Sequence, residues 1–234
     1  MVLVLAVALA PALALILYFY SRDRYEKEPL RALARSYGLG ILIAFPAVVL
    51  ERFLSVLPGL VPLVFLRPAV EAFVVVALVE EGLKYSAFSA YVFRHPDFDE
   101  PYDGILYAVM ISLGFASLEN VGYVLSAYTR FGMPGLAQIG LLRAFTAVPA
   151  HAFFGVLMGY YLGLARFVND SRRAKTLRIR GLIMAVVAHG LYNWFLFANT
   201  SQGVLFMLLL LLLCYRFSLR AIRIHNDNSP HRSS

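Results

Sequence analysis

The sequence has little charge for its length. Only 15% of its 234 residues are charged, whereas 60% are hydrophobic, and its mean hydropathy is +0.71. A soluble domain carries about 25% charged residues. The stretch Met1–Ser21 holds no charged residue at all. These shortages exclude an ordinary soluble globule and indicate an integral membrane protein.

Cysteine is nearly absent, and the apolar runs do not alternate with polar residues. A single cysteine, Cys214, excludes a disulfide framework and a paired-cysteine metal or redox site. A membrane helix needs about 20 apolar residues, because it rises ~1.5 Å per residue across ~30 Å of hydrocarbon. The continuous apolar runs reach that length, whereas barrel strands would alternate at every second residue. The expected fold class is therefore an all-α integral membrane protein.

Charge-free runs between polar breaks predict about seven transmembrane helices in a single polytopic membrane domain over residues 1–234. Their limits are 2–20, 36–57, 69–93, 104–127, 137–165, 181–199 and 203–222. Prolines and glycines near 58–68 and 132–135 break the chain, and the polar residues 199–203 divide the last long apolar run. We find no soluble domain and no repeat, and residues 223–234 form a polar C-terminal tail.

Basic residues are concentrated in the loops on one side of this predicted bundle. Residues 21–35 hold five, residues 166–180 hold six, and Arg94 and four residues near the C-terminus add to them, whereas the opposite loops hold only Arg67 and Arg130. Lys and Arg stay on the cytoplasmic side of a membrane. We therefore expect a multi-pass protein of the plasma membrane with its N-terminus outside and its C-terminus in the cytoplasm. Topology and anionic lipid account for the net charge of +7 without nucleic acid.

The first apolar run has one feature of a signal peptide, the small residues Ala12-Leu-Ala14. No basic residue precedes it, however, and the run continues to Tyr20. We expect an uncleaved first helix.

Several ionisable side chains lie inside the predicted spans, where each costs at least about 2.5 kcal/mol if it faces lipid. Those that fall near the middle of the bilayer, with one nearby amide, are Glu80, Glu81, Lys84, Glu119, Arg143, His151, His189 and Asn193. They come from four predicted helices, so they are expected to turn inward and meet. Glu51, Arg52 and Glu71 lie near helix ends, where long side chains reach the interface, and we interpret them as structural.

The spacing of these residues adds detail. Glu80 and Lys84 are four positions apart on one helical face, as are His189 and Asn193. His151 begins a row that continues through Gly155, Gly159 and Gly163 at four-residue steps. Small residues in such a row allow a neighbouring helix to approach closely.

Three familiar kinds of intramembrane protease do not fit the sequence. A zinc site-2 type needs a His-Glu-x-x-His motif, and no His-Glu dipeptide occurs. An aspartyl type needs two membrane aspartates, but all six aspartates fall in predicted loops. A rhomboid type needs a serine in a Gly-x-Ser setting, which is absent, and Cys214 lies near a helix end, away from the other candidates. Glutamate and histidine remain as the groups that could do chemistry.

At this point the residues resemble the PrsW family of membrane proteases. The motifs that carry the resemblance are Asp23-Arg-Tyr-Glu-Lys-Glu-Pro29, Glu80-Glu81-x-x-Lys84, Phe115-x-x-x-Glu119-Asn120, Pro149-Ala-His151 and His189-x-x-x-Asn193. Their order and spacing fit from about residue 18 to 197. The family belongs with the CAAX prenyl proteases and bacteriocin-processing enzymes, which carry Glu-Glu-x-x-x-Arg and Phe-x-x-x-His at the first two motifs. This chain has Lys84 one position earlier and Glu119 instead of histidine.

The resemblance implies a membrane-embedded glutamate-type endopeptidase. Glu80, with Glu81, would accept a proton from water while His151 helps to hold that water. His189 and Asn193 would stabilise the oxyanion. Glu119 could orient a histidine, balance Arg143 or activate water itself, and Lys84, Asn120 and Arg143 would support the site. The implied substrate is a single-span membrane protein such as an anti-sigma factor, cut near the outer surface in a signalling cascade.

Other interpretations compete with this one. We expect no cofactor, but the same residues could hold Zn²⁺, through Glu80, Glu119, His151 and His189, with Glu81 as a further donor. Midplane Glu, Lys and His also form proton relays, as in a proton-coupled transporter or channel, although no inverted repeat is evident. A non-catalytic scaffold is a further alternative. Each site residue could also act only as a buried ion pair or as interhelical hydrogen-bonding glue.

Overall fold

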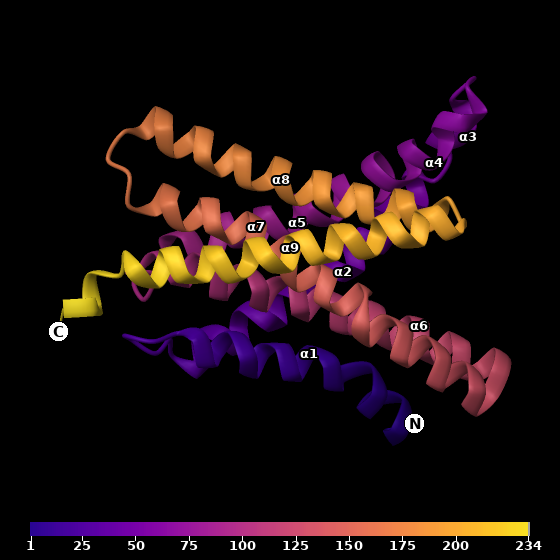
Figure 1. Cartoon of the computed structure of the whole chain (residues 1–234), viewed down its shortest axis with the longest axis horizontal. Helices are drawn as coiled ribbons and strands as arrows, with labels where there is room; N and C mark the ends of the chain where they lie inside the picture. The colour runs from indigo at the N-terminus through magenta and orange to yellow at the C-terminus, as the bar shows by residue number, and fades with distance from the viewer. Residues whose placement is uncertain (234) are drawn as a thin grey trace.

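The computed structural model describes residues 1–233, and this part of the chain is helical and contains no strand. Its long helices are α1 (Val2–Arg22), α2 (Leu30–Leu54), α5 (Leu78–Tyr91), α6 (Pro101–Phe145), α7 (Ala147–Arg166), α8 (Ser171–Phe197) and α9 (Ser201–Asp227) (Figure 1). Shorter helices are α3 (Leu57–Leu60), η1 (Val64–Leu66), α4 (Arg67–Val70), η3 (Val92–Arg94) and η4 (Pro230–Ser233). The prediction of an all-α membrane bundle is confirmed.

Five helical segments are long and apolar enough to cross a membrane by themselves. They are Val2–Arg22, Leu30–Leu60, Pro101–Arg166, Ser171–Phe197 and Ser201–Asp227. The third of these has 66 residues and turns back on itself, so it supplies two of the seven predicted passes. The remaining pass runs through residues 67–94, which are too rich in charge to be recognised by hydropathy.

This charged pass contains a π-helix, η2 (Glu71–Ala77), directly before α5. A π-turn closes each hydrogen bond one residue later than an α-turn and therefore rotates the residues that follow it; such turns are frequent at functional sites. Here it ends three residues before Glu80 and four before Glu81. Phe73 of this π-helix packs on Gly190 of α8, where an added Cβ would lie 2.2 Å from the Phe73 ring. This contact places α5, which follows the π-helix, beside α8.

The long α6 helix reverses at Gly132. Its φ of 64° is a left-handed conformation that glycine adopts without a Cβ clash. The predicted break at 132–135 therefore occurs at its first glycine. The predicted helix 137–165 is interrupted at Thr146 (φ −123°, ψ −76°) and is not continuous as expected. Pro149 has no N–H to donate to the carbonyl of Phe145, which accounts for the break.

Helix α7 packs on the first half of α6 through its predicted row of glycines. A Cβ added to Gly159 would lie 2.3 Å from the carbonyl oxygen of Gly104, and one added to Gly163 would lie 2.3 Å from that of Pro101. At Gly155 the nearest neighbour would be the Ser112 hydroxyl, at 2.8 Å. The two backbones therefore touch along three turns, and this contact fixes the position of His151 at the end of the row.

The basic loops lie together at one end of the bundle, which we call the basic end. The α1–α2 connection, the α7–α8 connection and the C-terminus lie at this end, on the left of Figure 1. Asn226 donates a hydrogen bond to the carbonyl of Arg22 (3.3 Å) and joins α9 to the end of α1. The grouping agrees with the predicted sidedness, although which end faces the cytoplasm remains a prediction.

Candidate active site

A buried lysine on α5 lies between two glutamates of the same helix. The Nζ atom of Lys84 is 2.7 Å from Oε1 of Glu81 and 3.0 Å from Oε2 of Glu80. All three side chains are at least 96% buried. The expected pair at four-residue spacing is present, and the shorter contact with Glu81, three residues away, was not foreseen. The ammonium group offsets the repulsion between the two adjacent carboxylates.

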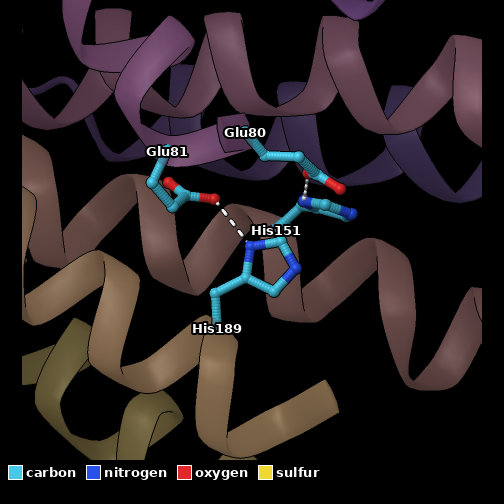
Figure 2. A group of neighbouring side chains, drawn as sticks. All are labelled: Glu80, Glu81, His151 and His189. Carbon is cyan, nitrogen blue, oxygen red and sulfur yellow. Dashed lines mark hydrogen bonds and ion pairs between the residues drawn. The ribbon is translucent and has the colours of Figure 1, made fainter. Parts of the chain in front are cut away.

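His151 of α7 joins this group from the opposite side (Figure 2). Its Nδ1 atom lies 3.2 Å from Lys84 Nζ and 3.9 Å from Glu80 Oε2, and its Nε2 atom lies 2.9 Å from Glu119 Oε2. Because an ammonium can only donate, Nδ1 accepts from Lys84 and the ring proton is assigned to Nε2, which donates to Glu119. Both ring nitrogens are therefore held, and the ring orientation is fixed.

His189 reaches the same group from α8. Its Nδ1 atom is 2.9 Å from Glu81 Oε1, and a dashed line in Figure 2 marks this contact. Its ring stacks on Phe154 with centroids 4.9 Å apart. The contact with the carboxylate assigns a proton to Nδ1. His189 is 3% exposed. Glu81 therefore orients His189 in the same way that Glu119 orients His151.

An ion pair between the two halves of α6 closes the site. Arg143 donates from Nη2 to Glu119 Oε2 (3.0 Å) and from Nε to Asn120 Oδ1 (2.7 Å). Asn120 in turn donates to the carbonyl of Ala8 in α1 (2.6 Å). Of the roles left open for Glu119, its contacts match two, since it holds the His151 ring and balances Arg143. The reversal at Gly132 is what brings Arg143 back to Glu119.

A polar cavity of about 130 Å³ lies against these residues. Its lining includes Glu80, Glu119, His151, His189 and Asn193. Asn193 is one turn beyond His189 on α8 and faces the same space, as its spacing predicts. The structure thus brings together every residue proposed for the site from sequence, including the supporting Lys84, Asn120 and Arg143.

One further carboxylate borders this cavity. Glu51 of α2 lines it together with Glu80 and Glu119. From its position near a helix end, the sequence predicts a structural role for Glu51. Glu51 follows Ala44 by seven residues and Val48 by three, so these three residues lie on one face of α2. This spacing is the sequence signal that could have indicated that Glu51 faces the interior.

The donor set fits a divalent cation. Ligand atoms of Glu80, Glu81, His151 and His189 all lie within 4.8 Å of one another. Glu81 Oε2 is buried and has no hydrogen-bond partner in the described residues. This group contains Glu81, whereas the set expected for zinc contained Glu119, which lies on the far side of the His151 ring. Lys84 already holds one oxygen of each carboxylate in the group.

The motif at Asp23–Pro29 lies apart from the site, at the basic end. Glu28 accepts a hydrogen bond from Tyr107, and Asp23 Oδ2 accepts one from the Glu28 amide (3.1 Å). Tyr107 precedes Glu119 by 12 residues on α6, which is about 18 Å of helix. Burial raises the pKa of Glu28 to about 7, against the opposing effect of the Tyr107 hydroxyl. This motif therefore braces the loop that joins α1 to α2.

Comparison with known proteins assigns this arrangement to a family. The chain matches, over residues 28–218, the family described as PrsW family intramembrane metalloprotease. It is 38% identical to the protein named Protease PrsW of Geobacillus kaustophilus over 82% of this chain and 80% of that protein. The Protease PrsW of Bacillus subtilis is 35% identical over 87% and 86%, and that of Oceanobacillus iheyensis is 32% identical over 98% and 99%. No solved structure matches the chain significantly.

Proposed function

This chain belongs to the PrsW family of intramembrane proteases and is a multi-pass membrane peptidase, and from that premise we propose that it cleaves a single-span membrane protein by a glutamate-activated water. The observation that carries the proposal is the contact of Glu80, Glu81, His151 and His189 around Lys84, beside a polar cavity. Three helices, α5, α7 and α8, supply these groups, which the bilayer would otherwise exclude.

In this mechanism a water molecule in the cavity is deprotonated by Glu80. The hydroxide oxygen bonds to the carbonyl carbon of the scissile peptide, and the proton on Glu80 passes to the leaving nitrogen as the C–N bond breaks. Lys84 holds one oxygen of Glu80 at 3.0 Å and so fixes the orientation of this carboxylate. Lys84 and Glu119 hold the His151 ring in place. This ring lines the part of the cavity in which the water would bind.

The oxyanion of the tetrahedral intermediate would lie against α8. Asn193 supplies an amide N–H, and His189, whose Nδ1 is held by Glu81, supplies an Nε2–H when both ring nitrogens carry a proton. Loss of a single donor of this kind lowers kcat by about 10²–10³-fold in other hydrolases. We therefore expect Asn193→Ala to reduce kcat more than it raises KM.

The substrate we propose is anti-sigma-factor-like, cut in a site-1-type step that begins a signalling cascade. The family resemblance supports this class, together with the position of the site in the half of the bundle opposite the basic end. With the predicted orientation, the cut would fall toward the outer face of the membrane.

The test compares membranes from cells that express the wild-type protein, Glu80→Gln or the control Glu71→Gln. Glu71 is also an intramembrane acid, but it borders a different pocket with Arg67 and Pro68. We expect new N-termini of a membrane protein with wild type and Glu71→Gln and none with Glu80→Gln. Identical catalogues from all three proteins, at equal abundance, would contradict proteolysis and favour the transporter interpretation.

A metal-dependent form of the same protease is the second candidate, because the four ligand atoms and the unpartnered Glu81 Oε2 fit one ion. Glu80, Glu81, His151 and His189 would hold it, and a bound zinc ion would acidify water and polarise the peptide carbonyl. Lys84 competes for the same oxygens, which is why we place the metal-free mechanism first. Elemental analysis of the purified protein separates the two mechanisms. If the wild type holds about one ion per chain and Glu81→Gln holds none, the metal-dependent mechanism replaces the metal-free one.

A further inference from the structure

A second cavity lies beside the site, between α2 and α6. It has a volume of about 350 Å³, within the range of ligand-binding pockets. Ala44, Val48 and Glu51 line it from α2, and Phe115, Leu118 and Gly122 are among the residues that line it from α6. Each set repeats at three- or four-residue steps, so each presents one helical face to the space. The cavity is apolar along most of its length and ends at carboxylates.

Glu51 belongs to both cavities, as do Glu80, Glu119 and Tyr123. The two cavities therefore adjoin at these four side chains. Glu51 follows Ala44 by seven residues, or about 10 Å along α2. A group that enters between α2 and α6 passes the apolar wall and meets Glu51 beside the proposed catalytic glutamate.

The charges around this junction do not balance. Four carboxylates, those of Glu51, Glu80, Glu81 and Glu119, face two cations. Lys84 is held by Glu80 and Glu81, and Arg143 by Glu119. Among residues 1–233 no cation lies within ion-pair distance of Glu51. An acidic side chain inside a membrane bundle that has no basic partner can form an ion pair with a positive group that enters the cavity.

We propose that the cavity between α2 and α6 receives a lysine or arginine side chain of the substrate next to the scissile bond, and that Glu51 selects it. These side chains have an apolar stem and a charged end, which matches an apolar cavity that ends at a carboxylate. The inference rests on the proposed proteolytic function. It makes Glu51 a specificity determinant, with no part in the bond-breaking steps.

Gly122 gives an independent way to test the cavity. A Cβ added there meets nothing within 4 Å, so a larger side chain would extend into the space. Gly38, on α2, has equally open surroundings but does not line the cavity. Gly122→Leu is expected to reduce cleavage of substrates with a basic residue at the selected position, and Gly38→Leu is the matched control.

The main experiment maps all cleavage sites that the protein produces in a host membrane proteome. With wild type and with Glu71→Gln we expect Lys or Arg to be enriched at one fixed position near the cut. With Glu51→Gln the enrichment should disappear, and with Glu51→Lys the position should favour Asp or Glu. For the most abundant site, replacing its basic residue by Gln should lower kcat/KM about tenfold with wild type and leave it unchanged with Glu51→Gln.

The outcomes separate the two proposals. If wild type produces no fragments, proteolysis itself fails, and this inference with it. If fragments appear without a preferred basic residue, or with the same preference in Glu51→Gln, only the Glu51 assignment is overturned. If Glu51→Gln abolishes cleavage of both the basic and the Gln-substituted site while Glu51→Asp retains it, Glu51 takes part in the chemistry and the selective role is wrong.

Discussion

Lys84 holds three groups of the site in place. Its ammonium contacts Glu80, Glu81 and His151, which belong to two helices. Its ring neighbour Phe115 lies 4.4 Å below the ammonium and provides a further cation–π contact. This cation offsets the repulsion between the two carboxylates on adjacent residues.

Lys84→Met should therefore destabilise the protein by about 3–5 kcal/mol, the usual effect of leaving a buried charge unpaired. Thermal unfolding in detergent measures the change. Lys84→Met combined with Glu81→Gln should recover part of the loss, because one of the two uncompensated charges is then removed. Equal stability of Lys84→Met and wild type would show that the carboxylates are compensated in another way.

Glu28 predicts a pH dependence at the basic end. Its pKa is raised from an ordinary 4.5 to about 7 by burial, so the folded protein binds a proton that the unfolded chain has released. Stability from this group is present below about pH 4.5 and is lost as the pH rises to about 7. Glu28→Gln should flatten the fall in unfolding temperature over this interval.

Tyr107→Phe serves as the comparison for that measurement. The Tyr107 hydroxyl donates to Glu28 and lowers the pKa of its carboxyl. Its removal should move the pH-dependent fall to higher pH without abolishing it. A slope unchanged in Glu28→Gln would assign the pH dependence to other groups.

Much of the site could be predicted at the level of residues, because few reasons exist for charge in the middle of a membrane. Glu80, Glu119, His151 and His189 were identified on that ground. The contact of Glu81 with His189 depends on helix rotation, which residue spacing alone does not determine. The position of Glu51 beside a cavity could not be predicted, because its distance from a helix end is visible in the sequence, whereas the cavity is not.

Among the helices, the close contact of α6 with α7 determines where His151 lies. Gly159→Ala would place a Cβ 2.3 Å from the backbone oxygen of Gly104, and backbone on both sides leaves little room to adjust. We expect a loss of about 1–3 kcal/mol in stability, typical of overpacking. Proteolytic activity should fall as well, since the helices must separate. Gly38→Ala, in open surroundings, should change neither quantity.

The helices themselves were predictable from charge-free runs, and the breaks at Gly132 and near residue 199 from glycine and polar residues. The interruption at Thr146 was not, although Pro149 gives its cause in retrospect. The π-helix at Glu71–Ala77 has no sequence signal of its own, and the packing of its Phe73 on Gly190 joins residues 117 positions apart in the chain. Local sequence thus determined where helices form, and tertiary packing determined how each one turns.

At the scale of the whole molecule, the basic end assigns a direction to the bundle. The expected orientation can be checked with single cysteines introduced into a variant in which Ser replaces the buried Cys214. Ala198 and Ser171 are exposed near opposite ends of α8. A membrane-impermeant maleimide should label Ala198→Cys in intact cells and Ser171→Cys only after permeabilisation. The reverse pattern would invert the predicted topology.

The cavity between α2 and α6 also bears on inhibition. Reagents that acylate a serine or alkylate a cysteine have no catalytic partner in the proposed mechanism, and Cys214 is buried away from the site. A reversible inhibitor would instead combine an apolar body of a size suited to about 350 Å³ with an amine placed to meet Glu51. Such amphiphilic amines partition into bilayers, so the compound would reach its target from the lipid. Potency would then follow the concentration in the membrane more closely than the concentration in the medium.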